Sequence, residues 1–177
     1  VEVINDKFEI ITMTNEEMVK YIQNNITKNL ILLPNGDQYK LKNLLPFDER
    51  IKMIKKIFPD IVIDNYENQQ EFRGTVKYLE DRNHPFFVIG GDSLKDLTGW
   101  IDCDNLIKNN KFIVFDRGNT DFKQLFDSSD ILKKYQSNFY ILNVSFSPVS
   151  SSEFRDSKNP LFVDEKIFDY INEKKLY

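Results

Sequence analysis

The sequence has very little cysteine and histidine, with one residue of each among 177. A lone cysteine, Cys103, excludes an internal disulfide and a metal site built from thiolates. A lone histidine, His84, excludes a metal site built from several histidines. A Ser-His-Asp hydrolase is also disfavoured, because no Gly-x-Ser-x-Gly motif occurs and His84 has no recognisable nucleophile beside it. We therefore predict that the protein holds no metal of its own.

The sequence also lacks long apolar runs and long basic runs. No apolar run approaches the ~20 residues of a membrane-spanning helix, and the N-terminus has no basic region followed by an apolar core. The formal net charge is −4, and no block of Lys and Arg is long enough to bind nucleic acid through a basic surface. These absences predict a soluble, cytoplasmic protein whose partners are small molecules, not nucleic acid or membranes. They leave the oligomeric state open, with a homo-oligomer among the alternatives.

What the sequence does have is a large supply of apolar and aromatic side chains. Hydrophobic residues make up 41% of the chain and aromatic residues 14%, which is typical of a folded core rather than a disordered chain. A chain of 177 residues can bury such a core without disulfides. We predict a single domain that spans residues 1–177.

Short apolar runs alternate with segments of helical periodicity along the chain. The expected strands are 8–12, 30–33, 61–64, 86–89, 111–115 and 139–144. The first expected helix begins after Thr14. The others span 46–58, 74–79, 94–97, 105–107, one or two segments within 120–135, and 164–174. Strands that alternate with helices at this spacing predict an α/β fold with a doubly wound, mainly parallel sheet.

A cluster of serines follows the last expected strand. Ser150, Ser151 and Ser152 are followed by Arg155 at the expected start of a helix. Hydroxyls, free backbone N–H groups and a guanidinium together bind phosphate well, so these residues form a candidate phosphate site. The alternative is that the serines do no more than cap the helix.

Two further groups follow expected strands. Gly90 and Gly91 precede Asp92 at the end of strand 86–89, where glycines let a ligand approach the backbone closely. Arg117 follows strand 111–115. Because ligands of doubly wound sheets bind outside the carboxyl ends of the strands, we expect these residues and the serines to converge on one cleft.

Several motifs in this order resemble the bacterial nicotinate mononucleotide adenylyltransferases of the nucleotidylyltransferase superfamily. The motifs are Gly90-Gly91-Asp92-Ser93-Leu94, Trp100, the segment 112–117, the segment 149–155, Asp169-Tyr170-Ile171 and Leu176-Tyr177. Lower-weight matches are Leu33-Pro34-Asn35-Gly36 with Lys40, the segment 50–54, and Thr75-Val76. The resemblance covers about residues 30–177.

The resemblance implies a Rossmann-like fold and an activity that transfers AMP from ATP, with Mg²⁺, to nicotinate mononucleotide in NAD biosynthesis. It implies that Ser150, Ser151, Ser152 and Arg155 hold the ATP phosphates. It further implies that Gly90, Gly91 and Asp92 approach the nucleotide, with Asp92 on ribose hydroxyls, and that Trp100 stacks on the nicotinate ring. By the same resemblance, Thr75 and Arg117 border the mononucleotide.

The chain departs from that family at its N-terminus, because it contains no His-x-Gly-His sequence. Counting back from Pro34 places that motif at 11–14, a segment that includes Thr12 and Thr14. Loss of one preorganised donor to the transition state typically costs ~3 kcal/mol, about a hundredfold in rate. A second departure is Gly74, which stands where the family tends to carry an aromatic residue.

Three explanations for the missing motif stay open. In the first, the motif lies upstream of Val1, which is not a methionine. In the second, the chain performs a weak or altered nucleotidyl transfer with Lys40, Arg117 and Arg155 as its cations. In the third, the chain is a catalytically silent relative that binds a nucleotide or a protein partner.

Overall fold

A computed structural model describes residues 10–12, 16–38, 45–116, 118, 120–144, 157, 159 and 164–176, and the structural statements below concern these residues. The strands are β1 (Ile10–Thr12), β2 (Leu30–Leu32), β3 (Val62–Ile63), β4 (Phe86–Gly90), β5 (Phe112–Asp116) and β6 (Phe139–Asn143). The α-helices are α1 (Glu16–Asn25), α2 (Phe47–Ile57), α3 (Thr75–Asp81), α4 (Gly91–Asp96), α5 (Cys103–Asn109), α6 (Phe122–Asp127), α7 (Asp130–Lys134) and α9 (Glu165–Lys174). Short 3₁₀ turns are η2 (Tyr66–Asn68), η3 (Leu97–Gly99) and η4 (Gln136–Asn138).

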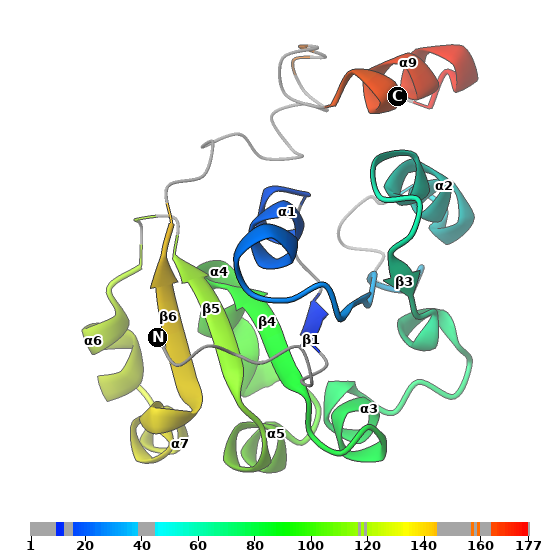
Figure 1. Cartoon of the computed structure of the whole chain (residues 1–177). Helices are drawn as coiled ribbons and strands as arrows, with labels where there is room; N and C mark the ends of the chain where they lie inside the picture. The colour runs from blue at the N-terminus through cyan, green and yellow to red at the C-terminus, as the bar shows by residue number, and fades with distance from the viewer. Residues whose placement is uncertain are drawn as a thin grey trace.

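The strands form one parallel sheet in the order β3-β2-β1-β4-β5-β6 (Figure 1). Every strand pair in it is parallel. The order reverses between β1 and β4, since the chain builds outward from β1 to β3 and then returns to β4 on the other side. This arrangement confirms the predicted doubly wound α/β fold and places the switch point, where such sheets bind ligands, between β1 and β4.

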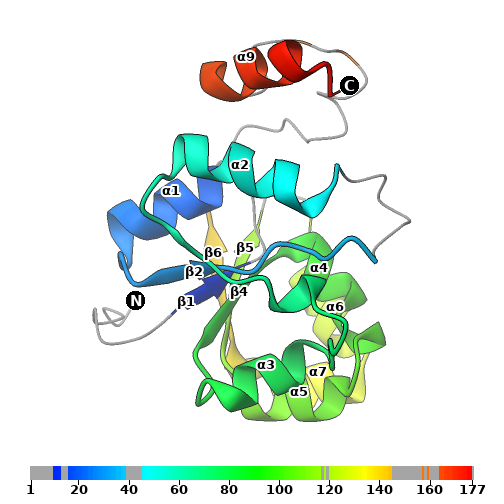
Figure 2. The same cartoon turned by 90° about the vertical axis from the view of Figure 1, so that its right-hand side faces the viewer.

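Helices cover both faces of the sheet, with α1 and α2 on one side and α3, α5 and α7 on the other (Figure 2). Each face of the sheet has its own hydrophobic core. Alternate side chains of each strand pack into the two cores, because successive residues of a strand point to opposite faces. Phe87 and Phe112 are fully buried in the core on the α5 side, whereas Val88 and Ile113 are buried in the core on the α1 side. No helix of the described chain is long and apolar enough to cross a membrane.

The element positions follow the sequence expectation, while several boundaries differ by a residue or two. Strand β2 ends at Leu32, although Leu33 after it is also fully buried. Strand β3 has only two residues, and Val62 in it is 56% exposed, because β3 lies at the edge of the sheet. Asp164 precedes α9 and accepts a hydrogen bond from the backbone N–H of Lys166, as an N-cap aspartate does.

Helix α9 packs on α2, at a distance from the sheet (Figure 1). Buried Ile167 and Ile171 of α9 contact Met53 and Ile57 of α2, and these side chains form a small cluster of their own with Phe168. Because α2 also contributes Ile54 to the core on the α1 side, α2 connects the C-terminal helix to the main body of the protein.

One polar contact strengthens this helix pair. The Tyr170 hydroxyl donates a 2.7 Å hydrogen bond to Glu49 Oε2, and Lys52 Nζ lies 2.6 Å from Glu49 Oε1. The Lys52 and Tyr170 hydrogen bonds stabilise the carboxylate and lower the pKa of Glu49 below its ordinary value of 4.5. The same bond to Glu49 raises the pKa of Tyr170.

Tyr170→Phe should therefore raise the pKa of Glu49 toward 4.5, because one of the hydrogen bonds that lower it is lost. A carboxyl group with a lowered pKa stabilises the fold above pH 4.5, and this stabilisation is lost as the pH falls through the folded-state pKa. The stability of the variant should therefore fall less than that of the wild type on acidification. An NMR titration of the Glu49 carboxyl in both proteins measures the shift. An unchanged Glu49 pKa would contradict the contact.

Candidate functional site

The switch point lies beside the junction of β4 and α4, where the sequence placed the Gly90-Gly91-Asp92 group. Gly90 ends β4, and Gly91 and Asp92 open α4. The Asp92 side chain is 82% exposed, with Lys95 Nζ 3.6 Å from its Oδ1. The sequence prediction that Asp92 lies at the carboxyl end of a central strand is confirmed, and its carboxylate is accessible to a ligand.

The two glycines differ in what surrounds them. A Cβ on Gly91 would lie 2.5 Å from Thr120 Oγ1, so the lack of a side chain there makes room for the segment that follows β5. Among the described residues, a Cβ on Gly90 would meet only Met18 Cε within 4 Å, at 3.9 Å. Gly91 therefore has a packing role that sequence reasoning did not foresee, and close approach of a ligand at Gly90 and Gly91 stays a prediction.

Trp100 follows η3 and lies half-buried against the core on the α5 side. Its ring meets the Phe87 ring edge-to-face, with 6.2 Å between centroids and an interplanar angle of 73°. This contact anchors the indole on Phe87, near the start of the central strand β4. Its partial exposure is compatible with the predicted stacking on a ligand ring, which stays a prediction.

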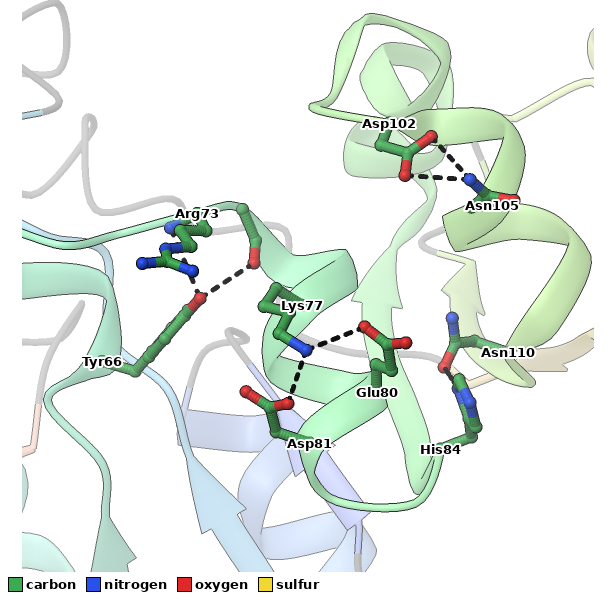
Figure 3. A network of polar contacts seen from close by, with 10 residues as sticks. Tyr66, Arg73, Lys77, Glu80, Asp81, His84, Asp102, Asn105 and Asn110 are labelled. Carbon is green, nitrogen blue, oxygen red and sulfur yellow. Dashed lines mark hydrogen bonds and ion pairs between the residues drawn. The ribbon is translucent and has the colours of Figure 1, made fainter.

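Thr75 is the first residue of α3 and is 5% exposed. Its hydroxyl lies 3.5 Å from Oε1 of Glu67, a carboxyl group that is itself 1% exposed. The turn before Thr75 is held by Tyr66, whose hydroxyl donates to the Gly74 carbonyl and accepts from the Arg73 N–H, each at 3.4 Å (Figure 3). Thr75 is therefore held in place by the fold, and only a small part of it reaches solvent.

The start of α1 lies next to the segment 11–14, where counting placed the histidine motif. Three residues, 13–15, connect the end of β1 to Glu16. Ile11, inside the segment where counting placed the histidine motif, pairs with Ile31 and Phe87 in the sheet. Glu16 and Glu17 occupy the first turn of α1, where their charge opposes a phosphate.

The described charged groups at this edge of the sheet are mostly acidic. Asp92 follows β4, Asp116 ends β5, and Glu16 and Glu17 open α1. A nucleotide that carries several phosphates requires compensating cations. The cations that the sequence offers, Lys40, Arg117 and Arg155, lie outside the described residues, as do Thr14, Ser150, Ser151 and Ser152, and Thr12 is described only through its backbone.

His84 and Cys103, the single histidine and the single cysteine, each contact a neighbouring polar side chain. His84 Nδ1 lies 2.9 Å from Asn110 Oδ1, at a turn where the His84 φ is 54° (Figure 3). Burial, followed by the neighbouring Asp104, raises the pKa of the Cys103 thiol. Burial contributes more to this rise than the acidic neighbours do. Within the described chain, no three His, Cys, Asp or Glu side chains form a cluster that could hold a metal.

The chain is similar to known proteins over most of its length. A family model described as cytidylyltransferase-like matches residues 6–157. A protein of Acholeplasma laidlawii named probable nicotinate-nucleotide adenylyltransferase is 30% identical over 85% of this chain and 82% of its own length. A protein of the same name from Clostridium acetobutylicum is 31% identical over 84% of this chain and 83% of its own length.

Among solved structures, the fold is similar to that of a nicotinic acid mononucleotide adenylyltransferase from Plasmodium falciparum, solved with APC. The TM-score is 0.74, the sequence identity is 21%, and the alignment covers 96% of this chain and 97% of that one. At this identity the similarity supports the fold alone, and it agrees with the parallel sheet described above.

Proposed function

The chain belongs to the cytidylyltransferase-like family and, within it, to the nicotinate-nucleotide adenylyltransferases, and from this premise we propose that it transfers AMP from ATP to nicotinate mononucleotide in NAD biosynthesis. The observation that carries the proposal is the match to adenylyltransferase relatives over more than four fifths of their length, 82% and 83%. The switch point between β1 and β4 supplies the place for the two nucleotides.

The proposed reaction requires alignment more than proton transfer. An oxygen of the mononucleotide phosphate attacks the α-phosphorus of ATP, a new P–O bond forms, and the bond to the bridging oxygen breaks to release pyrophosphate. No general base is needed, because the attacking phosphate oxygen is already ionised at neutral pH. The protein contributes by holding the two phosphates in line and by offsetting charge on the one that is transferred.

The sequence motifs supply the residue roles in this proposal. Ser150, Ser151, Ser152 and Arg155 bind the ATP phosphates, and Asp92 binds ribose hydroxyls. Trp100, with its ring already anchored on Phe87, stacks on the nicotinate ring. Thr75 and Arg117 border the mononucleotide.

Magnesium enters the proposal as a companion of the ATP phosphates. Mg²⁺ is commonly held by substrate phosphates and water with one or two carboxylates rather than by a protein cage. Asp92 and Asp116 are the described carboxylates at the ends of β4 and β5, and the described chain has no larger acidic cluster suited to the ion. The protein does not need a metal site of its own in this arrangement.

A catalytically silent nucleotide-binding relative is the second candidate. The observation that favours it is the start of α1, where Glu16 and Glu17 lie and the sequence has no histidine. Two carboxylates at a helix N-terminus weaken phosphate binding there, and the missing donors would each cost about a hundredfold in rate.

Purified protein incubated with ATP, magnesium and nicotinate mononucleotide should release pyrophosphate and form the dinucleotide, as measured by a coupled pyrophosphate assay and chromatography. Calorimetry with each nucleotide runs in parallel. Binding without pyrophosphate release would favour the silent relative. If the protein neither binds a nucleotide nor releases pyrophosphate, both candidates are overturned.

Arg155→Ala should weaken ATP binding about tenfold, because a hydrogen bond to a charged group contributes about 1.5 kcal/mol or more. Lys123→Ala, which removes an exposed cation from α6, is the matched control and should leave the affinity within about twofold. Calorimetric titration of ATP into both variants measures the difference. Equal affinities in the two variants would remove Arg155 from the proposed phosphate site.

A further inference from the structure

The loop after β2 lies at the carboxyl edge of the sheet, next to the central strand β1. Two elements that are distant in sequence, α2 and η2, hold its first residues, 35–38. The structure describes the chain up to Gln38 and again from Leu45, just before α2. Contacts with α2 and η2 hold the described residues on either side, 35–38 and Leu45.

Arg50 of α2 contacts both ends of the loop. Its Nη1 donates to the Asn35 carbonyl at 2.6 Å and its Nη2 donates to Asp37 Oδ1 at 2.9 Å. Its Nε donates to the Leu45 carbonyl at 2.8 Å. The guanidinium lies 5.3 Å from the centre of the Phe47 ring, and the side chain is only 13% exposed. A single side chain thus joins residues ten positions apart.

The opposite side of the loop rests on η2. The Asp37 N–H donates to Asn68 Oδ1 at 2.8 Å, and Gln38 Nε2 donates to the Glu67 carbonyl at 2.5 Å. Gly36 is buried, and a Cβ there would lie 2.0 Å from the Glu67 carbonyl oxygen, so the loop backbone packs directly on η2. Residues 36–38 are therefore held directly against Glu67 and Asn68.

Glu67 carries this connection to the candidate site. Its backbone carbonyl accepts from Gln38, whereas its side-chain Oε1 lies 3.5 Å from Thr75 Oγ1. Both Glu67 and Thr75 are at least 95% buried, with exposures of 1% and 5%. Glu67 thereby connects residues 36–38 to the start of α3, where Thr75 is proposed to border the mononucleotide.

We propose that Arg50 is a positioning residue: it fixes both ends of the loop after β2 and, through η2 and Glu67, the position of Thr75 for mononucleotide binding. The inference rests on the proposed function for its ligand. Arg50 itself does not touch substrate in this account. It acts through the loop and η2.

The geometry is specific to arginine. A guanidinium offers several N–H donors in one rigid plane, which matches three acceptors that approach from different chain segments. A lysine offers one point charge on a flexible stem and cannot reach both ends of the loop at once. We therefore expect Arg50→Lys to behave like Arg50→Ala, whereas a simple requirement for positive charge would be met by lysine.

The test compares Arg50→Lys and Arg50→Ala with Lys52→Ala, a matched control that removes an exposed cation from the same helix. Steady-state kinetics give separate KM values for ATP and nicotinate mononucleotide. Hydrogen exchange gives the protection of the Asp37 N–H, which is bonded to Asn68. A thermal unfolding curve gives the folded fraction of each variant at the assay temperature.

In both Arg50 variants we expect the KM for nicotinate mononucleotide to rise about tenfold, the KM for ATP to stay within about twofold, and exchange at Asp37 to accelerate about tenfold. Lys52→Ala should match the wild type in all three. The proposal is overturned if Arg50→Lys matches the wild type, or if kcat falls only with the folded fraction while both KM values stay unchanged. If the wild type shows no turnover, the proposed transferase function fails. The role of Arg50 is then decided by two other measurements on the same variants: the affinity for nicotinate mononucleotide by calorimetry, and the exchange rate of the Asp37 N–H.

Discussion

Phe112→Ala is expected to lower the free energy of unfolding by about 4 kcal/mol, the largest effect that we expect from a single change. Phe112 is fully buried in β5, between β4 and β6. Its ring stacks on Phe139 at 4.8 Å with an interplanar angle of 14°, and it meets Phe87 edge-to-face at 6.3 Å. Truncation would leave a cavity between three strands that the surrounding backbone cannot close.

Urea denaturation at equilibrium measures this loss. Tyr140→Ala on the neighbouring strand β6 is a suitable control, since Tyr140 is an aromatic residue that is 48% exposed, and its loss should cost about 1 kcal/mol or less. A Phe112→Ala protein that unfolds within about 1 kcal/mol of the wild type would show that the aromatic core is not packed as described.

Gly74→Ala is expected to cost about 2 to 3 kcal/mol, because Gly74 adopts φ 88° and ψ 160°, a conformation that is almost restricted to glycine. An added Cβ would also lie 2.9 Å from Cβ of Ile101. Any side chain at this position would be strained in this backbone. Gly74 sets the entry into α3 just before Thr75.

Gly99→Ala is the matched control, because a Cβ at Gly99 meets no heavy atom of the described residues within 4 Å, its own helix and chain neighbours aside, and its φ is not in the left-handed region. Gly99→Ala should change the stability by about 0.5 kcal/mol or less. Thermal and urea unfolding of both variants give the comparison. If Gly74→Ala proved as stable as Gly99→Ala, the turn before α3 would have to relax without cost, and the described backbone would be wrong there.

The strands and helices could be predicted well because each has a strong local signal. The run 86–89 is wholly apolar, which is typical of a strand buried on both faces, and the structure places it as β4 beside the switch point. The sequence predicts a helix over 164–174, and the structure confirms it as α9, Glu165–Lys174, with Asp164 as its N-cap. Boundaries such as the end of β2 depend on neighbouring strands, which local patterns do not contain.

The candidate site was only partly predictable. Asp92, Trp100 and Thr75 were singled out, and the structure places them at the end of β4, after η3 and at the start of α3. Arg50 lies in a lower-weight motif match and Glu67 in none, but neither role could be predicted from the sequence. Arg50 reaches Asn35 across 15 positions, and the Glu67 carbonyl meets Gln38 across 29. Contacts of this kind arise from the packing of distant segments, not from a motif.

The sequence by itself determined the fold class, the family and the absence of the histidine motif within this chain, because apolar periodicity and motif order are written along the chain. Only the tertiary structure decided that Gly91 makes room for Thr120, that Gly74 excludes a side chain, and that Arg50 joins the two ends of one loop. These three features depend on distances between segments that are far apart in sequence. Folding of the sheet brings those segments together, so their roles became visible only in three dimensions.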